Sequence, residues 1–229
     1  VYVYERVGPG NVWSLMDTIT GSDSVSGDQF GRSIGISGSA IIVGAYISGN
    51  GKAYVFRLHS ATWVEEAILA STDATSGDNF GAQVAIGGNA AAVTARNHNG
   101  YGNDRGAVYF YRYSGGWSSG YKTIASAVED FGEFGTSVRI SGDNAVVSAF
   151  LECSSACAAG VLPAQGALYA LRRDSGNTWR ETKRITAPDA ASNDRLGFGI
   201  GLSGNSVVAG AAFASPGGLS NAGKIYFFH

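Results

Sequence analysis

Short apolar runs recur along the whole chain, separated by turns rich in glycine, asparagine and serine. Each run spans about five residues and is rich in β-branched and aromatic side chains, which is typical of β-strands. The runs are of four kinds that follow one another in a fixed order, and we expect no helix between them. The pattern therefore predicts an all-β protein built from repeated groups of four strands.

The four kinds of run differ in where their polar residues lie. The first follows a Phe-Gly pair (33–37), and the second is apolar on both faces (41–43). The third carries aromatic residues (53–57), and the fourth mixes a Trp with charged residues (62–66). We expect the second run inside the sheet and the fourth at its solvated outer edge. Loops of two or three residues, such as 38–39, predict tight hairpins between the first two runs.

Two independent markers fix the register of the repeat. The aromatic or leucine residue that precedes the first run and the Trp of the fourth run both recur at spacings of 50, 54 and 62 residues. A period near 50 residues predicts a propeller or an array of blades. We place the repeats at about residues 1–19 (partial), 20–69, 70–124, 125–185 and 186–229 (partial), within one domain spanning residues 1–229. The markers are Phe30, Phe80, Phe134 and Leu196, and Trp13, Trp63, Trp117 and Trp179.

The heads and second runs of the repeats resemble a known family. Phe-Gly at the head, with Gly44-Ala45 or Gly210-Ala211 ending the second run, is similar to FG-GAP repeats, the blades of the integrin α-chain propeller and of many bacterial and algal extracellular proteins. The resemblance covers essentially the whole chain. It departs at Thr94-Ala95, Ser148-Ala149 and Leu196. It implies a β-propeller of four-stranded antiparallel blades, about four in this chain, which is complete or part of a larger propeller or array.

Charge and hydropathy exclude two classes of partner. The net charge is −2 and no Lys/Arg cluster offers a track for phosphates, which argues against nucleic acid. No apolar run approaches the length of a membrane span. The chain opens at Val1 in what looks like the middle of a repeat, so we expect a mature or excised piece of a longer product.

Cys153 and Cys157 are the only cysteines. Two free thiols are one interpretation, but we favour a local disulfide, which implies an oxidising compartment and an extracellular or cell-surface protein.

The connections from the fourth run to the next first run are acidic and rich in hydroxyl groups, as in 22–28 and 72–78. Their carboxylates are either oxygen ligands for a cation or acceptors for the backbone of their own turns. Repetition in several blades favours the second interpretation. In calcium-binding members of the family that this chain resembles, the metal loop is similar to an Asp-x-Asp-x-Asp-Gly insertion between the first two strands of a blade. Here that loop has two or three residues, too few for six to eight oxygen ligands. We therefore expect no metal site and no cofactor.

The sequence gives little support for catalysis. The three histidines are His59, His98 and His229, and none lies in a recognisable nucleophile motif. The paired carboxylates Glu65 and Glu66 belong to the solvated fourth run. We therefore expect a protein that is not an enzyme.

The loops between the second and third runs vary most in length, and in an up-and-down blade they share one face with the acidic connections. Length variation on one face of a constant scaffold is typical of recognition, although simple loop drift would produce it too. One loop mixes amide, aromatic and charged groups, as a glycan or protein site would. The candidate ligand-binding residues are Arg96, Asn97, His98, Asn99, Tyr101, Asn103 and Asp104.

Two functions remain open from the sequence. The first is non-catalytic recognition or adhesion outside the cell, through binding of protein or glycan by this loop face. The alternative is a structural subunit or segment of an extracellular fibre or surface layer, linked by strand exchange between copies. The strand count is 17, one more than four blades need. The strand of Trp13 could close the last blade as its outer strand, which would leave the strand of Tyr2 surplus. The surplus indicates either a segment of a longer array of blades or N-terminal strands that complete a blade in a neighbouring molecule, so we expect that the segment is not a simple closed monomer.

Overall fold

The computed structural model describes residues 1–8, 10, 12–47, 49–100, 102–153 and 164–229. These residues form 17 strands and one 3₁₀ turn, Pro216–Gly218, and no α-helix lies within them. All strand pairs are antiparallel and join neighbours in sequence. An N-terminal hairpin pairs β1 (Tyr2–Val7) with β2 (Val12–Thr18). Three four-stranded sheets and a three-stranded sheet follow.

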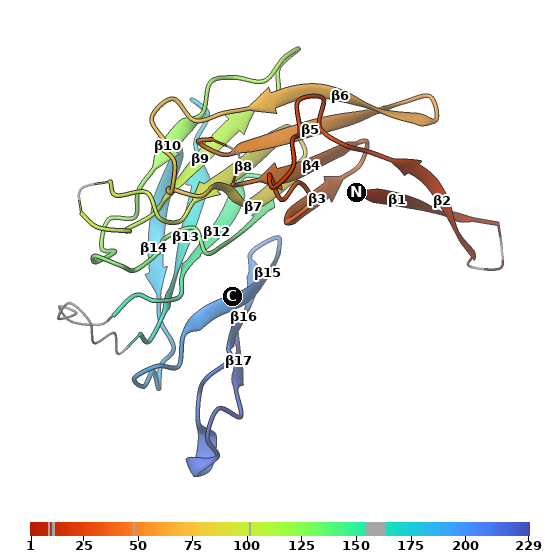
Figure 1. Ribbon diagram of the computed structural model, residues 1–229. Coiled ribbons are helices and arrows are strands. Elements are labelled where there is room, and N and C mark those ends of the chain that lie inside the picture. Colours follow the sequence, from red (N-terminus) through yellow and green to blue (C-terminus); the bar gives the residue numbers. More distant parts are fainter. Residues whose placement is uncertain (9, 11, 48, 101, 154–163) are drawn as a thin grey trace.

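Each sheet corresponds to one predicted repeat (Figure 1). The first blade contains β3 (Ser33–Ser37), β4 (Ala40–Ala45), β5 (Lys52–His59) and β6 (Thr62–Leu69). The second contains β7 (Phe80–Gly87), β8 (Ala90–Ala95), β9 (Ala107–Arg112) and β10 (Tyr121–Thr123). The third contains β11 (Ser137–Ser141), β12 (Asn144–Ala149), β13 (Ala167–Arg173) and β14 (Trp179–Ile185). The last sheet contains β15 (Leu196–Ser203), β16 (Ser206–Ala211) and β17 (Lys224–Phe228).

Burial along the blades follows the hydrophobic pattern. The second strands β4 and β8 are buried at every position, because both faces of each pack against other blades. The fourth strands β10 and β14 are mostly exposed, as expected of outer edges. One boundary differs from the prediction: Trp117 lies before β10 and forms only an isolated bridge with Tyr113. The glycine-rich segment around Trp117 shortens this edge strand to three residues.

The blades pack face to face in a row, and their cores lie between them. The hairpin packs on the first blade through a cluster that includes Val3 and Phe56. Further clusters join the first blade to the second, the second to the third, and the third to the last sheet. In Figure 1 the hairpin β1–β2 lies at one end of this row and β15–β17 at the other. These blades confirm the all-β propeller architecture of FG-GAP type.

The row of blades does not close into a ring. Among the described strands, β2 pairs only with β1, and none pairs with the outer edge of β17. The prediction that the strand of Trp13 closes the last blade within the same chain is therefore not met by this structure. The reason is that β1 and β17 are both third strands, so the hairpin cannot join the last sheet while β17 occupies that position.

Candidate functional site

The loop face carries the connections that follow the second and fourth strands of each blade. Gly44 near the end of β4 pairs with Ala53, and Leu69 at the end of β6 pairs with the same residue, so both connections emerge at one end of the blade. The structure confirms that the two kinds of loop meet: His98 Nε2, from the first kind, lies 3.7 Å from Asp73 Oδ2, from the second.

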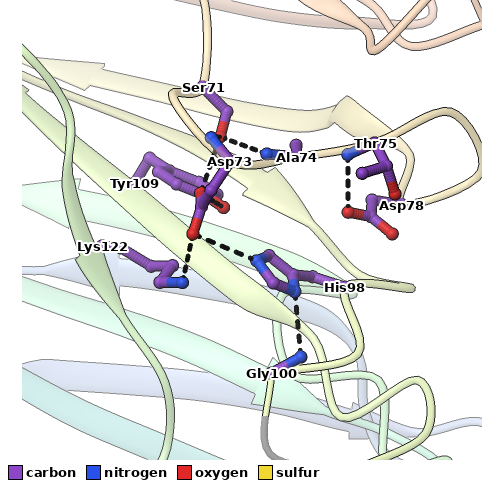
Figure 2. A network of polar contacts seen from close by, with 9 residues as sticks. All are labelled: Ser71, Asp73, Ala74, Thr75, Asp78, His98, Gly100, Tyr109 and Lys122. Carbon is purple, nitrogen blue, oxygen red and sulfur yellow. Dashed lines mark hydrogen bonds and ion pairs between the residues drawn. The ribbon is translucent and has the colours of Figure 1, made fainter.

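Asp73 is the centre of a polar cluster on this face (Figure 2). Its Oδ1 accepts hydrogen bonds from the Tyr109 hydroxyl at 2.7 Å and from Ser71 Oγ at 3.0 Å. Its Oδ2 binds the ammonium group of Lys122. The imidazole of His98 is buried, stacks on the Tyr109 ring and accepts a hydrogen bond at Nδ1 from the Gly100 amide. The cluster ties the incoming loop to the third and fourth strands of the blade.

The same cluster recurs in the first and last blades. The hydroxyl of Tyr54 donates to Asp23 Oδ1 at 2.6 Å, and that of Tyr226 donates to Asp189 Oδ1 at 2.6 Å. In both blades the cation is a lysine two residues before the tyrosine. These lysines are Lys52 and Lys224. In the second blade, Lys122 instead comes from the fourth strand, directly opposite Tyr109.

The third blade builds the cluster from a different loop. Ala127 stands where the other blades have the aspartate. Glu152, from the loop after β12, supplies the carboxylate instead. Its Oε2 accepts a hydrogen bond from the Tyr169 hydroxyl at 2.5 Å, and its Oε1 lies 2.5 Å from Arg184 Nη2. Arg184 lies opposite Tyr169 on the fourth strand, as Lys122 lies opposite Tyr109. The tyrosine–carboxylate–cation arrangement therefore persists although its carboxylate comes from elsewhere.

The cluster perturbs the acid–base behaviour of its members. Burial alone would raise the pKa of Asp73, but hydrogen bonds from Lys122, Tyr109 and Ser71 outweigh it and lower that pKa below its usual range. Burial and the bond to Asp23 raise the pKa of the Tyr54 hydroxyl to about 12. Asp23, whose pKa is lowered by the bonds from Lys52 and Tyr54, and Asp73 are therefore charged and their tyrosines neutral over the physiological range, whereas burial raises the pKa of Glu152 in the third blade.

A second set of carboxylates caps the turns just before the first strand of the first, second and last blades. Asp28, Asp78 and Asp194 each accept a hydrogen bond from the backbone amide three residues earlier, at 2.7, 2.8 and 2.9 Å. The interpretation that acidic residues of these connections serve their own turns is confirmed for these three. The sequence did not reveal that the other aspartates, Asp23 and Asp73 among them, bind tyrosines and lysines instead.

Most of the predicted ligand-binding loop is held by contacts within the protein. Asn97 Oδ1 accepts from Asn79 Nδ2 at 2.5 Å, and Asn99 Oδ1 accepts from the Asp104 amide at 3.3 Å. Asn103 donates to Asp130 at 3.3 Å. Tyr101 lies outside the described residues.

The carbonyl groups of this loop bind the next blade. Those of Asn103, Asp104 and Arg105 accept hydrogen bonds from the amides of Phe131, Glu133 and Phe134 at 2.7, 3.1 and 2.7 Å. Residues 103–105 thus link the second blade to the third. This structural role explains much of the length and polarity of the loop without a ligand.

Arg96 differs from its neighbours because it faces a small polar pocket of about 40 Å³. Its Nη1 lies 3.5 Å from Glu133 Oε2, and its buried Nε has no hydrogen-bond partner among the described residues. Arg32 lines the same pocket, and no ion pair involves it within the described part of the chain. The remaining lining residues are Tyr46, Ala82, Gln83 and Thr136.

Cys157, one of the two cysteines of the predicted disulfide, lies outside the described residues. No group of three or more metal-ligating side chains occurs among the residues that the structure describes. Within the same residues, no helix is long and apolar enough to cross a membrane.

The blades and their loop face define a repeat protein of the β-propeller type. Comparison with known families gives its particular class: the FG-GAP repeat matches residues 13–56, 63–111 and 179–228, which together make up more than half of the chain. The chain belongs to the FG-GAP repeat family. The matched ranges leave out residues 112–178, which hold most of the third blade and its Glu152.

Comparisons with individual proteins add little. No curated protein sequence matches the chain significantly. Among the solved structures that match is the crystal structure of the computationally designed Ika4 protein, which is 11% identical with a TM-score of 0.46 over 92% of this chain and 99% of that one. A similarity at this level carries no conclusion about function.

Proposed function

We propose that the protein is a non-catalytic recognition module, outside the cell or on its surface, whose loop face binds an acidic group of a protein or glycan ligand. Repeats of this family are typical of extracellular proteins, which supports the location. The observation that carries the proposal is the pair Arg32 and Arg96 beside one polar pocket. Two guanidinium groups that lack a full set of partners favour a carboxylate or sulfate group.

The neighbouring side chains suit the same kind of ligand. Gln83 and Thr136 offer uncharged donors, and Tyr46 offers an aromatic face. The predicted residues Asn97, His98 and Asn103 then act mainly by holding the loop that presents Arg96, since their polar groups already bind other parts of the protein.

The test is binding of immobilised polygalacturonate, heparin and polyglutamate, with neutral dextran as the blank. Replacement of both arginines (Arg32→Gln with Arg96→Gln) should weaken binding at least tenfold, because each charge-assisted hydrogen bond contributes about 1.5–3 kcal/mol. Arg180→Gln is the control, since Arg180 lies near the turn between β13 and β14, at the end of the third blade opposite the loop face. Equal loss in the control, or no binding of any acidic probe, would reject the proposal.

A second function, a structural subunit that joins copies of itself, is favoured by a different observation. Aromatic and aliphatic side chains are exposed at both ends of the row of blades, including Tyr2 and Trp13 at one end and Ile225 and Phe227 at the other. Exposed strand edges and apolar faces of this kind invite pairing with another chain.

A further inference from the structure

The N-terminal hairpin is the outer half of a blade. Its register repeats that of β5–β6, including the irregularity at the same place: between Val3 and Tyr4 in β1, and between Val55 and Phe56 in β5. By this alignment β1 is a third strand and β2 a fourth strand. No described strand pairs with the other edge of β1, where the first and second strands of that blade would lie.

A hollow marks the position of the missing strands. A cavity of about 230 Å³ lies between residues 1–4, at the start of the hairpin, and the inner strands β3 and β4 of the first blade. Ile34 and Ile36 line it and are 60% and 65% exposed. Their equivalents in the second blade, Val84 and Ile86, are 2% and 7% exposed because the first blade covers them.

The other end of the chain has the complementary deficit. The last sheet holds first, second and third strands, and no described strand pairs with the outer edge of the third. One face of its third strand, β17, is uncovered: Ile225 and Phe227 are 68% and 80% exposed, whereas the equivalent Ala53 and Val55 are buried against the second blade. Strand β1 carries aromatic residues at the positions that Tyr226 and Phe228 occupy in β17.

We propose that the partner is a second copy of this chain: β15 and β16 of one copy fill the hollow beside β1 of the other, so that β1–β2 replace β17 and complete a four-stranded blade. This inference rests on the second proposed function and specifies its junction. The interface continues the blade-to-blade packing that the chain already repeats within itself. It also covers Tyr2 and Tyr4, whose equivalents Tyr54 and Phe56 are buried in the first blade.

The alignment predicts which residues of the two copies become cross-strand partners. Ile42 pairs with Val55 in the first blade, so Val208 of one copy should pair with Val3 of the other. Chains carrying Val3→Cys and Val208→Cys are mixed in equal amounts and oxidised. Because each chain carries one added cysteine, a covalent two-chain product that the unmixed variants and the parent do not form reports a contact between copies.

A second cysteine pair tests the competing arrangement, in which β17 stays and β2 of the other copy pairs with it. Val55 pairs with Ala67 in the first blade, so that arrangement would cross-link Asp17→Cys with Phe227→Cys. We expect the first pair to cross-link and the second not to. The reverse result, or no cross-link from either pair, would overturn the proposed junction.

Light scattering separates this inference from the broader function. Ile36→Lys should abolish assembly, because the charge would be buried between copies, and it leaves the monomer folded because Ile36 is exposed there. Val25→Lys is the control, equally exposed at 65% but in the loop between β2 and β3 and not among the residues that line the hollow. A parent chain that is monomeric at every concentration would reject both the assembly function and the junction. An assembled parent that cross-links only through the second pair would reject the junction alone.

Discussion

Gly44 and Gly81 lie in contact across two blades. A Cβ atom on Gly44 would lie 2.1 Å from the carbonyl oxygen of Gly81, and one on Gly81 would lie 2.4 Å from that of Lys52. Gly81 also has a φ of 92°, which disfavours other residues. The glycine of Phe-Gly and that of the preceding Gly-Ala therefore recur because they are the two sides of one backbone contact between blades.

The departures from this motif obey the same geometry. Thr94 and Ser148 replace the Gly-Ala glycine in the next two blades, and their side chains face Gly135 and Gly197 of the following blade. Each interface thus keeps at least one glycine, so one side chain fits in the space where two would clash.

Gly44→Ala should destabilise the protein by about 1–3 kcal/mol or more, because the added methyl group forces the first two blades apart. Gly116→Ala is the control, since a Cβ atom there meets nothing within 4 Å. The measurement is the urea midpoint of each variant. Equal midpoints for the two variants would contradict the contact.

Phe56→Ala should cost about 3–5 kcal/mol, because the ring is buried between the hairpin and the first blade. Tyr121→Ala, which truncates an exposed aromatic residue of an outer strand, should change stability by less than about 0.5 kcal/mol. Thermal melts of both variants check this, and a parent-like melt of Phe56→Ala would show that the strand faces are assigned wrongly.

Glu152→Ala should be among the most damaging polar substitutions, at about 3–5 kcal/mol, because it leaves Arg184 and the buried Tyr169 hydroxyl without their acceptor. Glu152→Gln should cost less, since an amide oxygen can still accept from Tyr169. Denaturant titration of both variants checks the order. Equal losses would mean that the volume of the side chain, and not its acceptor, is what the third blade needs.

Acid should weaken the cluster at Asp73. Its pKa is lowered in the folded protein, so its contribution is fully present above the unfolded value, near 3.8, and is lost as the pH falls from there toward the folded value. Asp73→Asn should remove this part of the pH dependence, and Tyr109→Phe, which takes away one donor, should move the loss to higher pH. The measurement is the unfolding midpoint across acid pH. An unchanged acid profile in Asp73→Asn would contradict the assignment.

A chelator should leave the melting temperature unchanged, because the aspartates of the loop face already bind tyrosine and lysine side chains. A large fall in melting temperature would show instead that the loops of Asp23, Asp73 and Asp189 hold a cation.

Cys153 and Cys157 should resist alkylation until the protein is reduced. Intact-mass measurement with and without a reductant decides this, and labelling of both thiols in the unreduced protein would rule out the bridge.

The order of the strands could be predicted from sequence because the polarity of each strand's own residues indicates how deeply the strand is buried. The continuously apolar 41–43 and the charged 62–66 are local signals, and the structure places them inside and at the edge of the blade. Trp117 shows the limit of such signals: its repeat position suited a strand, but in the glycine-rich segment around it only an isolated bridge to Tyr113 forms.

The polar cluster was missed because its members are far apart in sequence. Tyr54 is 31 residues from Asp23, and Tyr109 is 36 residues from Asp73. A signal was present, since a tyrosine recurs in the third strand of each blade. Its carboxylate partner could not be predicted without knowing that the loop before the blade folds back onto that strand. Nor could local patterns show whether the row of blades closes, because closure depends on the sum of small angles between blades.

Glu152 relieves position 127 of the role that an aspartate has in the other three blades. An alanine is tolerated there because Tyr169 and Arg184 already have their acceptor on the loop after β12. The carboxylate of this cluster can therefore come from either of the two loops that meet on the loop face. The third blade depends on the loop after its second strand, whereas the other blades depend on the loop before their first strand.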